Sequence, residues 1–179
     1  SMIGAAYHYL KEYEQALQYH QKALRIRLDR YGPQHIQTAY VYNNLGLTYS
    51  ELELYQEAID HFEKSNAIKA HELGPMHQTI GGTCLNLGVC YNELGQYDQA
   101  LIPLRKALQI FREVRNSNHP IIIGAYGNIG NAYTSSGNHR EAVKVAQEGL
   151  MEASTDFSNE DPYVNPPVNS LVLHIYVLN

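Results

Sequence analysis

The amino-acid sequence predicts an all-α solenoid built from antiparallel helix pairs. The first observation is a step of 42 residues, which separates four glycines that each precede a tyrosine by three positions: Gly4, Gly46, Gly88 and Gly130. The second is a Tyr-x-x-Ala motif at the same step, at 13–16, 55–58 and 97–100, with His139 replacing the tyrosine at 139–142. The third is a histidine in the connections, at His35, His77 and His119. A fixed period indicates repeats that contact their neighbours and expose a long continuous face.

The second repeat shows why each unit should fold as two helices. Between residues 37 and 51, Tyr42, Leu45 and Tyr49 recur at the spacing of one helix face. A short turn at 53–54 leads to a helix at 55–73, which Gly74-Pro75 ends because proline cannot continue a helix. The same pattern predicts pairs at 77–93 with 97–115 and 119–135 with 139–153, after an incomplete first helix at 2–10 with its partner at 12–30.

Two features inside these helices need a reason. A glycine in a helix costs about 1 kcal/mol relative to alanine. We therefore expect the repeated glycines to allow close helix packing, with Gly46 facing Ala58, Gly88 facing Ala100 and Gly130 facing Ala142. Pro103 lies several residues into its helix and lacks a backbone donor, so it should bend or delay that helix.

Composition narrows the function classes. The net charge of -5 and the pI near 6.0 show no basic surface for nucleic acid or an anionic membrane. No stretch is long and apolar enough to span a bilayer, and no leader opens the chain. Cys84 and Cys90 match neither a CxxC pair nor a zinc motif, so they are expected to be buried thiols in a reducing, cytoplasmic compartment. Ser1-Met2 precedes a block that is mid-helix in later repeats, so we expect a piece of a larger protein.

These motifs resemble the tetratricopeptide repeat, through the Gly and Ala pair, the tyrosine three residues after the glycine and the Leu-Gly-x-x-Tyr segments at 45–49 and 87–91. The resemblance implies a right-handed superhelix over 1–153, with repeats at 1–31, 35–73, 77–115 and 119–153. The long step resembles kinesin light chains, and the segment 126–133 is similar to Leu-Gly-Asn scaffolds; the residues do not choose between them. An irregular tail is expected at 154–179, as an improvised cap or a degenerate further repeat. Its apolar run 171–178 would form either that cap or an alternative terminus.

In such a superhelix one face of each first helix lines a concave groove. Asn44, Asn86 and Asn128 recur there at the repeat step. An amide offers both a donor and an acceptor, so this column could hold the backbone of an extended peptide, or it could instead bond neighbouring repeats. The candidate peptide-binding residues on this face are Tyr40, Asn43, Asn44, Leu47, Leu85, Asn86, Val89, Asn92, Asn128 and Asn131. For the leucines, ordinary packing between repeats is the competing interpretation.

The charge of this face bears on its ligands. Co-chaperone members of the family grip terminal carboxylates with lysines and arginines, whereas here the inner face carries only Glu51 and Glu93. An uncharged to mildly acidic groove would disfavour acidic ligands, including the acidic motifs that kinesin light chains prefer. The connection histidines are too far apart to share a metal ion. They should instead stabilise the loop that enters each helix. The repeated tyrosines should be core residues whose hydroxyls reach partners at the edge.

The sequence therefore predicts a non-enzymatic protein–protein interaction module, a scaffold or adaptor that binds an extended or helical peptide segment. No catalytic motif, metal site or cofactor site is expected, and neither nucleic acid nor membrane is an expected partner. The alternative is a structural array that self-associates, or packs on its own chain, and regulates an effector domain elsewhere in a larger chain.

Overall fold

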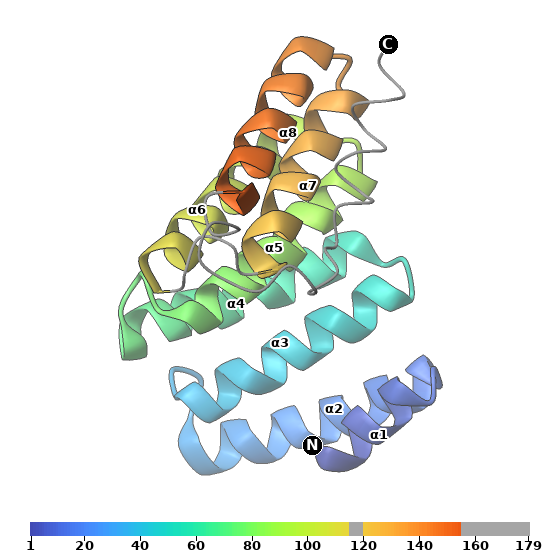
Figure 1. The fold of residues 1–179 in the computed structure, drawn as a ribbon. Helices are drawn as coiled ribbons and strands as arrows, with labels where there is room; N and C mark the ends of the chain where they lie inside the picture. The colour runs from blue at the N-terminus through green and yellow to red at the C-terminus, as the bar shows by residue number, and fades with distance from the viewer. Residues whose placement is uncertain (115–119, 155–179) are drawn as a thin grey trace, which may run out of the picture.

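The computed structural model describes residues 1–114 and 120–154, which contain eight helices. They form four successive antiparallel pairs: α1 (Met2–Tyr9) with α2 (Tyr13–Tyr31), α3 (Ile36–Glu51) with α4 (Tyr55–Leu73), α5 (Gln78–Glu93) with α6 (Tyr97–Val114), and α7 (Pro120–Ser135) with α8 (His139–Ser154). Each helix packs on the next one in the chain, and α5 also contacts α3 and α7 across the pairs. Figure 1 shows the pairs stacked in order, from α1–α2 in blue to α7–α8 in orange. The predicted all-α repeat array is confirmed.

The tight turns inside the four pairs share one backbone geometry, which recurs at the repeat step of 42 residues. The turn between the two helices of each pair contains one residue with positive φ: Lys11 at 61°, Glu53 at 59°, Gly95 at 72° and Gly137 at 79°. Glycine suits this left-handed conformation, which costs other residues more. The turns therefore have one geometry even where the sequence does not mark it with glycine.

Two of the connection histidines bond to the backbone at the start of the following helix, as predicted. The Nδ1 atom of His35 accepts the backbone N–H of Gln37 at 3.1 Å, and Nδ1 of His77 accepts that of Thr79 at 3.3 Å. Each bond satisfies one of the N–H groups that a helix start leaves without a partner. His119 lies outside the described residues, as does the tail beyond Ser154.

The repeated glycines lie against large side chains rather than against the predicted alanines. A Cβ built on Gly46 would lie 2.6 Å from the Phe62 ring, and one on Gly88 would lie 2.3 Å from Leu104. The predicted facing of Ala58 and Ala100 is therefore wrong by one helical turn, because the contact falls on the residue four positions later. The same position in the first pair is His20, 2.8 Å from a Cβ on Gly4.

Gly130 departs from this packing. Within residues 1–114 and 120–154, no atom beyond the glycine's own stretch of helix backbone lies within 4 Å of a Cβ built there, so the close approach predicted against Ala142 is wrong as well. The residue that corresponds to Phe62 and Leu104 in this pair is Ala146, which is too small to fill the space. Close packing across the helix pair therefore explains the repeated glycine in the first three pairs only.

Pro103 does not delay its helix. Helix α6 begins at Tyr97 and continues through the proline to Val114, so the predicted delay is wrong. Burial explains this result, because Ala100, Leu104 and Ala107 on the same helix are fully buried and outweigh one missing backbone bond. Whether the helix bends at Pro103 stays a prediction.

Tyrosine hydroxyls link successive pairs at a constant spacing of 28 residues. Gln21 donates to Tyr49 at 3.4 Å, Tyr91 donates to Glu63 at 3.2 Å, and Arg105 donates to Tyr133 at 2.7 Å. The three rings are partly buried and pack beside buried apolar clusters, so the prediction of packed tyrosines with bonded hydroxyls is confirmed for Tyr49, Tyr91 and Tyr133. For Tyr7 it stays a prediction. Cys84 and Cys90 are buried free thiols, as predicted. Within the described ranges no helix is long and apolar enough to cross a membrane.

Candidate functional site

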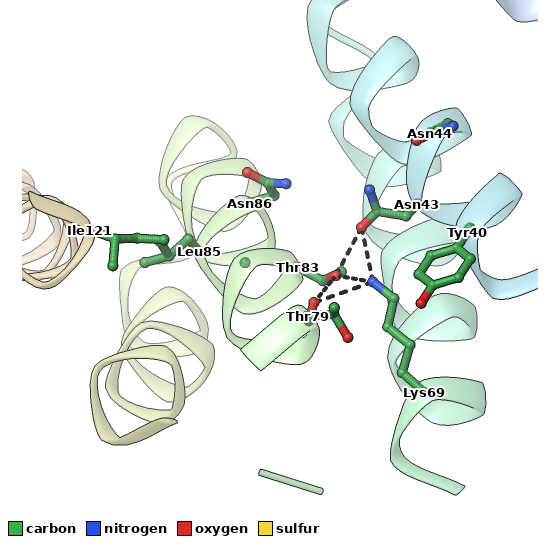
Figure 2. Close-up of a pocket in the computed structure, with 10 residues that line it drawn as sticks. Tyr40, Asn43, Asn44, Lys69, Thr79, Thr83, Leu85, Asn86 and Ile121 are labelled. Carbon is green, nitrogen blue, oxygen red and sulfur yellow. Dashed lines mark hydrogen bonds between the residues drawn. The ribbon is translucent and has the colours of Figure 1, made fainter. Parts of the chain in front are cut away.

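A pocket of about 400 Å³ opens on the face formed by α3, α5 and the start of α7. Figure 2 shows its walls, with α3 and α4 on one side of α5 and Ile121 of α7 on the other. We call it the central pocket, and its lining residues are Tyr40, Asn43, Asn44, Lys69, Thr79, Gly82, Thr83, Leu85, Asn86 and Ile121. Five of them belong to the set predicted from the sequence: Tyr40, Asn43, Asn44, Leu85 and Asn86.

Lys69 was not predicted at this site. It lies on α4, is only 2% exposed, and its Nζ atom donates to Thr83 Oγ1 at 2.7 Å and to Asn43 Oδ1 and the Thr79 carbonyl at 3.3 Å each. Burial lowers the pKa of this ammonium from 10.5 to about 8. The prediction of a groove without a basic residue is therefore wrong, because the lysine reaches the face from the second helix of its pair.

A signal for Lys69 was present in the sequence. One repeat later, the corresponding position is Phe111, which is 2% exposed and packs over Gly81. A lysine at a position that is apolar in the next repeat indicates a buried charge with a local role. The inward stripe of the second helices, and not only that of the first, carries site residues.

Asn43 joins neighbouring repeats. Its Oδ1 atom accepts from Lys69 and also from the hydroxyl of Thr83 at 2.8 Å, and Thr83 is itself 1% exposed. These bonds connect α3, α4 and α5 and fix which way the amide points, because the oxygen must face the two donors. Asn43, which lies beside the column of Asn44, Asn86 and Asn128, therefore uses its amide oxygen to join neighbouring repeats.

Asn44 and Asn86 differ from Asn43. Both are half-buried, both line the central pocket, and their side-chain amides make no hydrogen bond within residues 1–114 and 120–154. Side-chain amides at a pocket wall that have no protein partner are available to a ligand.

The other predicted residues lie outside the central pocket. Leu47 packs against the buried cluster around Phe62, so the packing interpretation holds for it. Asn92 donates to the backbone carbonyl of Asn128 on α7 at 3.3 Å and thus joins α5 to α7. Val89 and Asn128 are half-buried, whereas Asn131 is exposed.

The charge of the central pocket comes from Lys69. No aspartate or glutamate is among its lining residues, and both predicted groove carboxylates, Glu51 and Glu93, are exposed. Glu51 accepts the hydroxyl of Tyr13 on α2 at 2.9 Å. The expectation of a mildly acidic groove is therefore wrong at the central pocket, which is positive. Across residues 1–114 and 120–154, no group of three or more His, Cys, Asp or Glu side chains is placed to hold a metal ion.

Comparison with family models matches residues 1–70 and 82–150 to the tetratricopeptide repeat. No curated protein matches the chain. Among solved structures, a kinesin light chain-type protein with nearly identical TPR-like repeats from Podosopora anserina aligns with a TM-score of 0.84 at 18% identity, over 99% of this chain and 84% of that one. BtubC (BKLC) from P. vanneervenii aligns with a TM-score of 0.81 at 17% identity, over 93% of this chain and 66% of that one.

A third similar structure is the Rap conjugation gene regulator of the plasmid pLS20 in complex with the Phr* peptide. It aligns with a TM-score of 0.64 at 18% identity, over 83% of this chain and 40% of that one. At these identities the structures establish the fold alone. The chain spans well under half of the Rap regulator.

Proposed function

The chain belongs to the tetratricopeptide repeat family, and we propose that it is a non-catalytic adaptor that binds an extended or helical segment of a partner protein along the face of α3, α5 and α7. Tetratricopeptide repeats generally bind protein or peptide partners, and the Rap neighbour is described in complex with a peptide. The binding surface would centre on the central pocket and continue along this face to Asn128 and Asn131.

The observation that carries the proposal is the pair Asn44 and Asn86. These residues occupy corresponding positions in adjacent repeats, line one pocket and have no hydrogen-bond partner in the described part of the chain. Each can donate to a carbonyl and accept from an N–H of a peptide backbone, which does not depend on the peptide's sequence. Tyr40, Leu85 and Ile121 supply the apolar part of the same wall.

The experiment selects a peptide from a random library on the wild-type chain and then measures its affinity and the melting temperature for matched variants. Asn44→Ala combined with Asn86→Ala should weaken binding about tenfold or more with nearly unchanged melting, because each lost hydrogen bond contributes about 0.5–1.5 kcal/mol. Gln99→Ala removes an exposed amide on α6 and should change neither quantity.

Asn43→Ala serves as the contrasting variant. It should lower the melting temperature, because Lys69 and Thr83 would lose their shared acceptor. Full affinity in the double variant would count against the groove, and so would a loss of affinity that only follows a loss of stability.

A structural array is the second candidate, and one observation favours it. At the α1 end of the stack, four apolar side chains are largely exposed: Met2 at 90%, Ile3 at 55%, Tyr9 at 86% and Leu10 at 65%. Exposed apolar side chains of this size are typical of an interface with another copy of the chain. Sedimentation that shows a dimer, and that returns to a monomer when Tyr9 and Leu10 are replaced by serine, would support this candidate.

A further inference from the structure

The second half of α2 exposes a position that the next two repeats bury. Ile26 is 61% exposed, whereas Ile68 and Ile110, which occupy the same repeat position, are 4% and 0% exposed. In the third pair the first half of α5 provides the cover, because a Cβ built on Gly81 would lie 3.2 Å from Cγ2 of Ile110. A helix is therefore what covers this position in that pair.

Helix α1 packs on the first half of α2. Gly4 lies against His20, and Tyr7 stacks on Tyr19 with the ring centroids 5.3 Å apart. Helix α2 continues well beyond these contacts, and Figure 1 shows the start of α1 beside the middle of α2. Helix α1 has 8 residues, whereas α3, α5 and α7 have 16 each. Within residues 1–114 and 120–154, no first helix therefore covers the part of α2 around Ile26.

Four basic side chains flank Ile26, against a single carboxylate, that of Asp29, in the same part of the helix. The four are Lys22, Arg25, Arg27 and Arg30. Lys22 and Arg30 lie one turn to either side of Ile26, on the same face of the helix. None of the four cations enters an ion pair within residues 1–114 and 120–154. This part of α2 is therefore positive in a chain whose net charge is -5.

Aromatic rings hold three of these four cations. Arg27 and Arg30 lie 5.4 and 5.2 Å from the centroid of the Tyr31 ring, and Lys22 lies 5.1 Å from the centroid of the Tyr19 ring. A ring attracts a cation through its π electrons but does not neutralise its charge. The cations are therefore kept in place on α2 and can still pair with carboxylates.

We propose that this part of α2 binds an amphipathic helix of a partner protein, which runs antiparallel to α2. The apolar stripe of that helix covers Ile26, and glutamates or aspartates beside the stripe meet the cations. A small residue suits the closest approach, because Gly81 lies there in α5 and the fully buried Ala39 occupies the same position in α3. This surface is separate from the groove of the proposed function. We call it the α2 face, and it comprises Lys22, Arg25, Ile26, Arg27 and Arg30.

Charge favours a partner helix over a second copy of the chain as the occupant. A two-fold dimer brings the same surface of both copies together. Two α2 faces in contact would place four cations of one copy against four of the other, and like charges across an interface are costly. A helix with acidic flanks has the complementary charge.

The test measures the binding of a synthetic helical peptide to the full 179-residue chain. The probe is a fluorescent peptide of about 16 residues, with leucine and alanine on one helix face and glutamate on both flanks. The control peptide carries lysine in place of every glutamate. We expect the glutamate peptide to bind at least about tenfold more tightly and to lose affinity as salt is added, because salt screens exposed charges. Absence of binding by the glutamate peptide, or equal binding of the two peptides, would overturn the proposal.

A matched pair of variants tests the apolar contact. Ile26→Ser should weaken binding of the glutamate peptide about tenfold, because the isoleucine is buried only in the complex. Ile102→Ser replaces an isoleucine on α6 that is also exposed, so it should leave the affinity unchanged. An affinity that survives Ile26→Ser would refute the α2 face.

A second matched pair tests the charges. Arg25→Gln combined with Arg30→Gln should reduce the preference for the glutamate peptide over the lysine peptide. Lys106→Gln combined with Arg140→Gln changes the net charge equally and should keep the preference intact. All four side chains are exposed, so none of these changes should unfold the chain. Equal effects of the two double variants would show that only the net charge of the chain attracts the peptide.

Further outcomes separate this inference from the other assignments. A dimer in sedimentation that dissociates in Ile26→Ser would assign the α2 face to a second copy and overturn the partner helix. Asn44→Ala combined with Asn86→Ala should leave binding of the glutamate peptide unchanged, because both residues line the central pocket. A loss of binding in that variant would place the peptide in the groove. Failure to select a library peptide for the groove would count against the adaptor function and leave the α2 face as it is.

Discussion

The glycines inside the first helices make a direct test of the packing argument, because two of them have opposite surroundings. At Gly88 a Cβ would lie 2.3 Å from both Cγ and Cδ2 of Leu104, a side chain that is fully buried. At Gly130 no described atom beyond its own stretch of helix backbone lies within 4 Å of the same position. The two residues correspond to each other in the repeat, so they share a helix position and differ in the neighbour.

The expected effects follow from two opposing contributions. Alanine is favoured over glycine in a helix interior by about 1 kcal/mol, which applies at both sites. At Gly88 the new methyl must also displace a branch-point carbon, and such overpacking costs about 1–3 kcal/mol. Gly130→Ala should therefore stabilise the chain by about 1 kcal/mol, whereas Gly88→Ala should be neutral or destabilise it by up to about 2 kcal/mol.

Urea unfolding followed by circular dichroism measures the two changes. For a domain of this size, 1 kcal/mol corresponds to about 2–4 °C in melting temperature, so thermal scans should show the two variants shifting apart. The double variant Gly88→Ala with Leu104→Ala reproduces the small-residue pair of the fourth repeat, and in that background the added methyl should no longer be harmful. Equal shifts for Gly88→Ala and Gly130→Ala would show that the neighbour across the helix pair does not determine which residue the position accepts.

Two further predictions concern single side chains, and a third concerns metal binding. Burial lowers the pKa of His20 from 6.5 to about 4, so protonating the unfolded chain should remove stability as the pH falls from 6.5 to 4, by on the order of 3 kcal/mol, and His20→Leu should abolish this part of the pH dependence measured by urea unfolding. Tyr126→Phe should destabilise the chain by about 1 kcal/mol in the same assay, because the buried hydroxyl donates to Glu152 at 2.6 Å and links α7 to α8; an unchanged midpoint would mean that this bond is not stabilising. Adding EDTA should leave the melting temperature unchanged, and a drop would reveal a metal site.

Much of the fold follows from the sequence because the repeat step constrains every unit at once. A helix pair that buries one face cannot be stable alone, so the positions that recur must be the ones that pack. Spacing along the chain does not determine which residue of the second helix meets each glycine, however, because neighbours four residues apart lie on the same face. The contact at Phe62 rather than Ala58 depends on how far one helix slides along the other, and only the structure gives this offset.

The pocket residues on the first helices of the pairs were largely predictable, whereas the one on a second helix was missed. Asn44 and Asn86 occupy the same repeat position and both reach the central pocket. Lys69 was missed because the groove was assigned to the first helices alone, whereas a long lysine side chain can reach a pocket from the helix behind. The role of Asn43 could not be deduced either, since its partners Lys69 and Thr83 come from two other helices.

Replacing the buried Lys69 tests whether its charge contributes to the stability of the fold. Its position is occupied by the buried Phe111 in the next repeat, so the fold accepts an apolar side chain there. In Lys69→Met the Thr83 hydroxyl still has Asn43 Oδ1 at 2.8 Å and the Thr79 carbonyl at 3.1 Å as acceptors, so the change leaves no polar group newly isolated. Lys69 pairs with no described carboxylate, so replacing it by an apolar side chain removes the cost of burying a charge. The variant should therefore melt at or above the wild-type temperature in thermal scans followed by circular dichroism. A large drop in melting temperature would instead identify the lysine as a structural link between repeats.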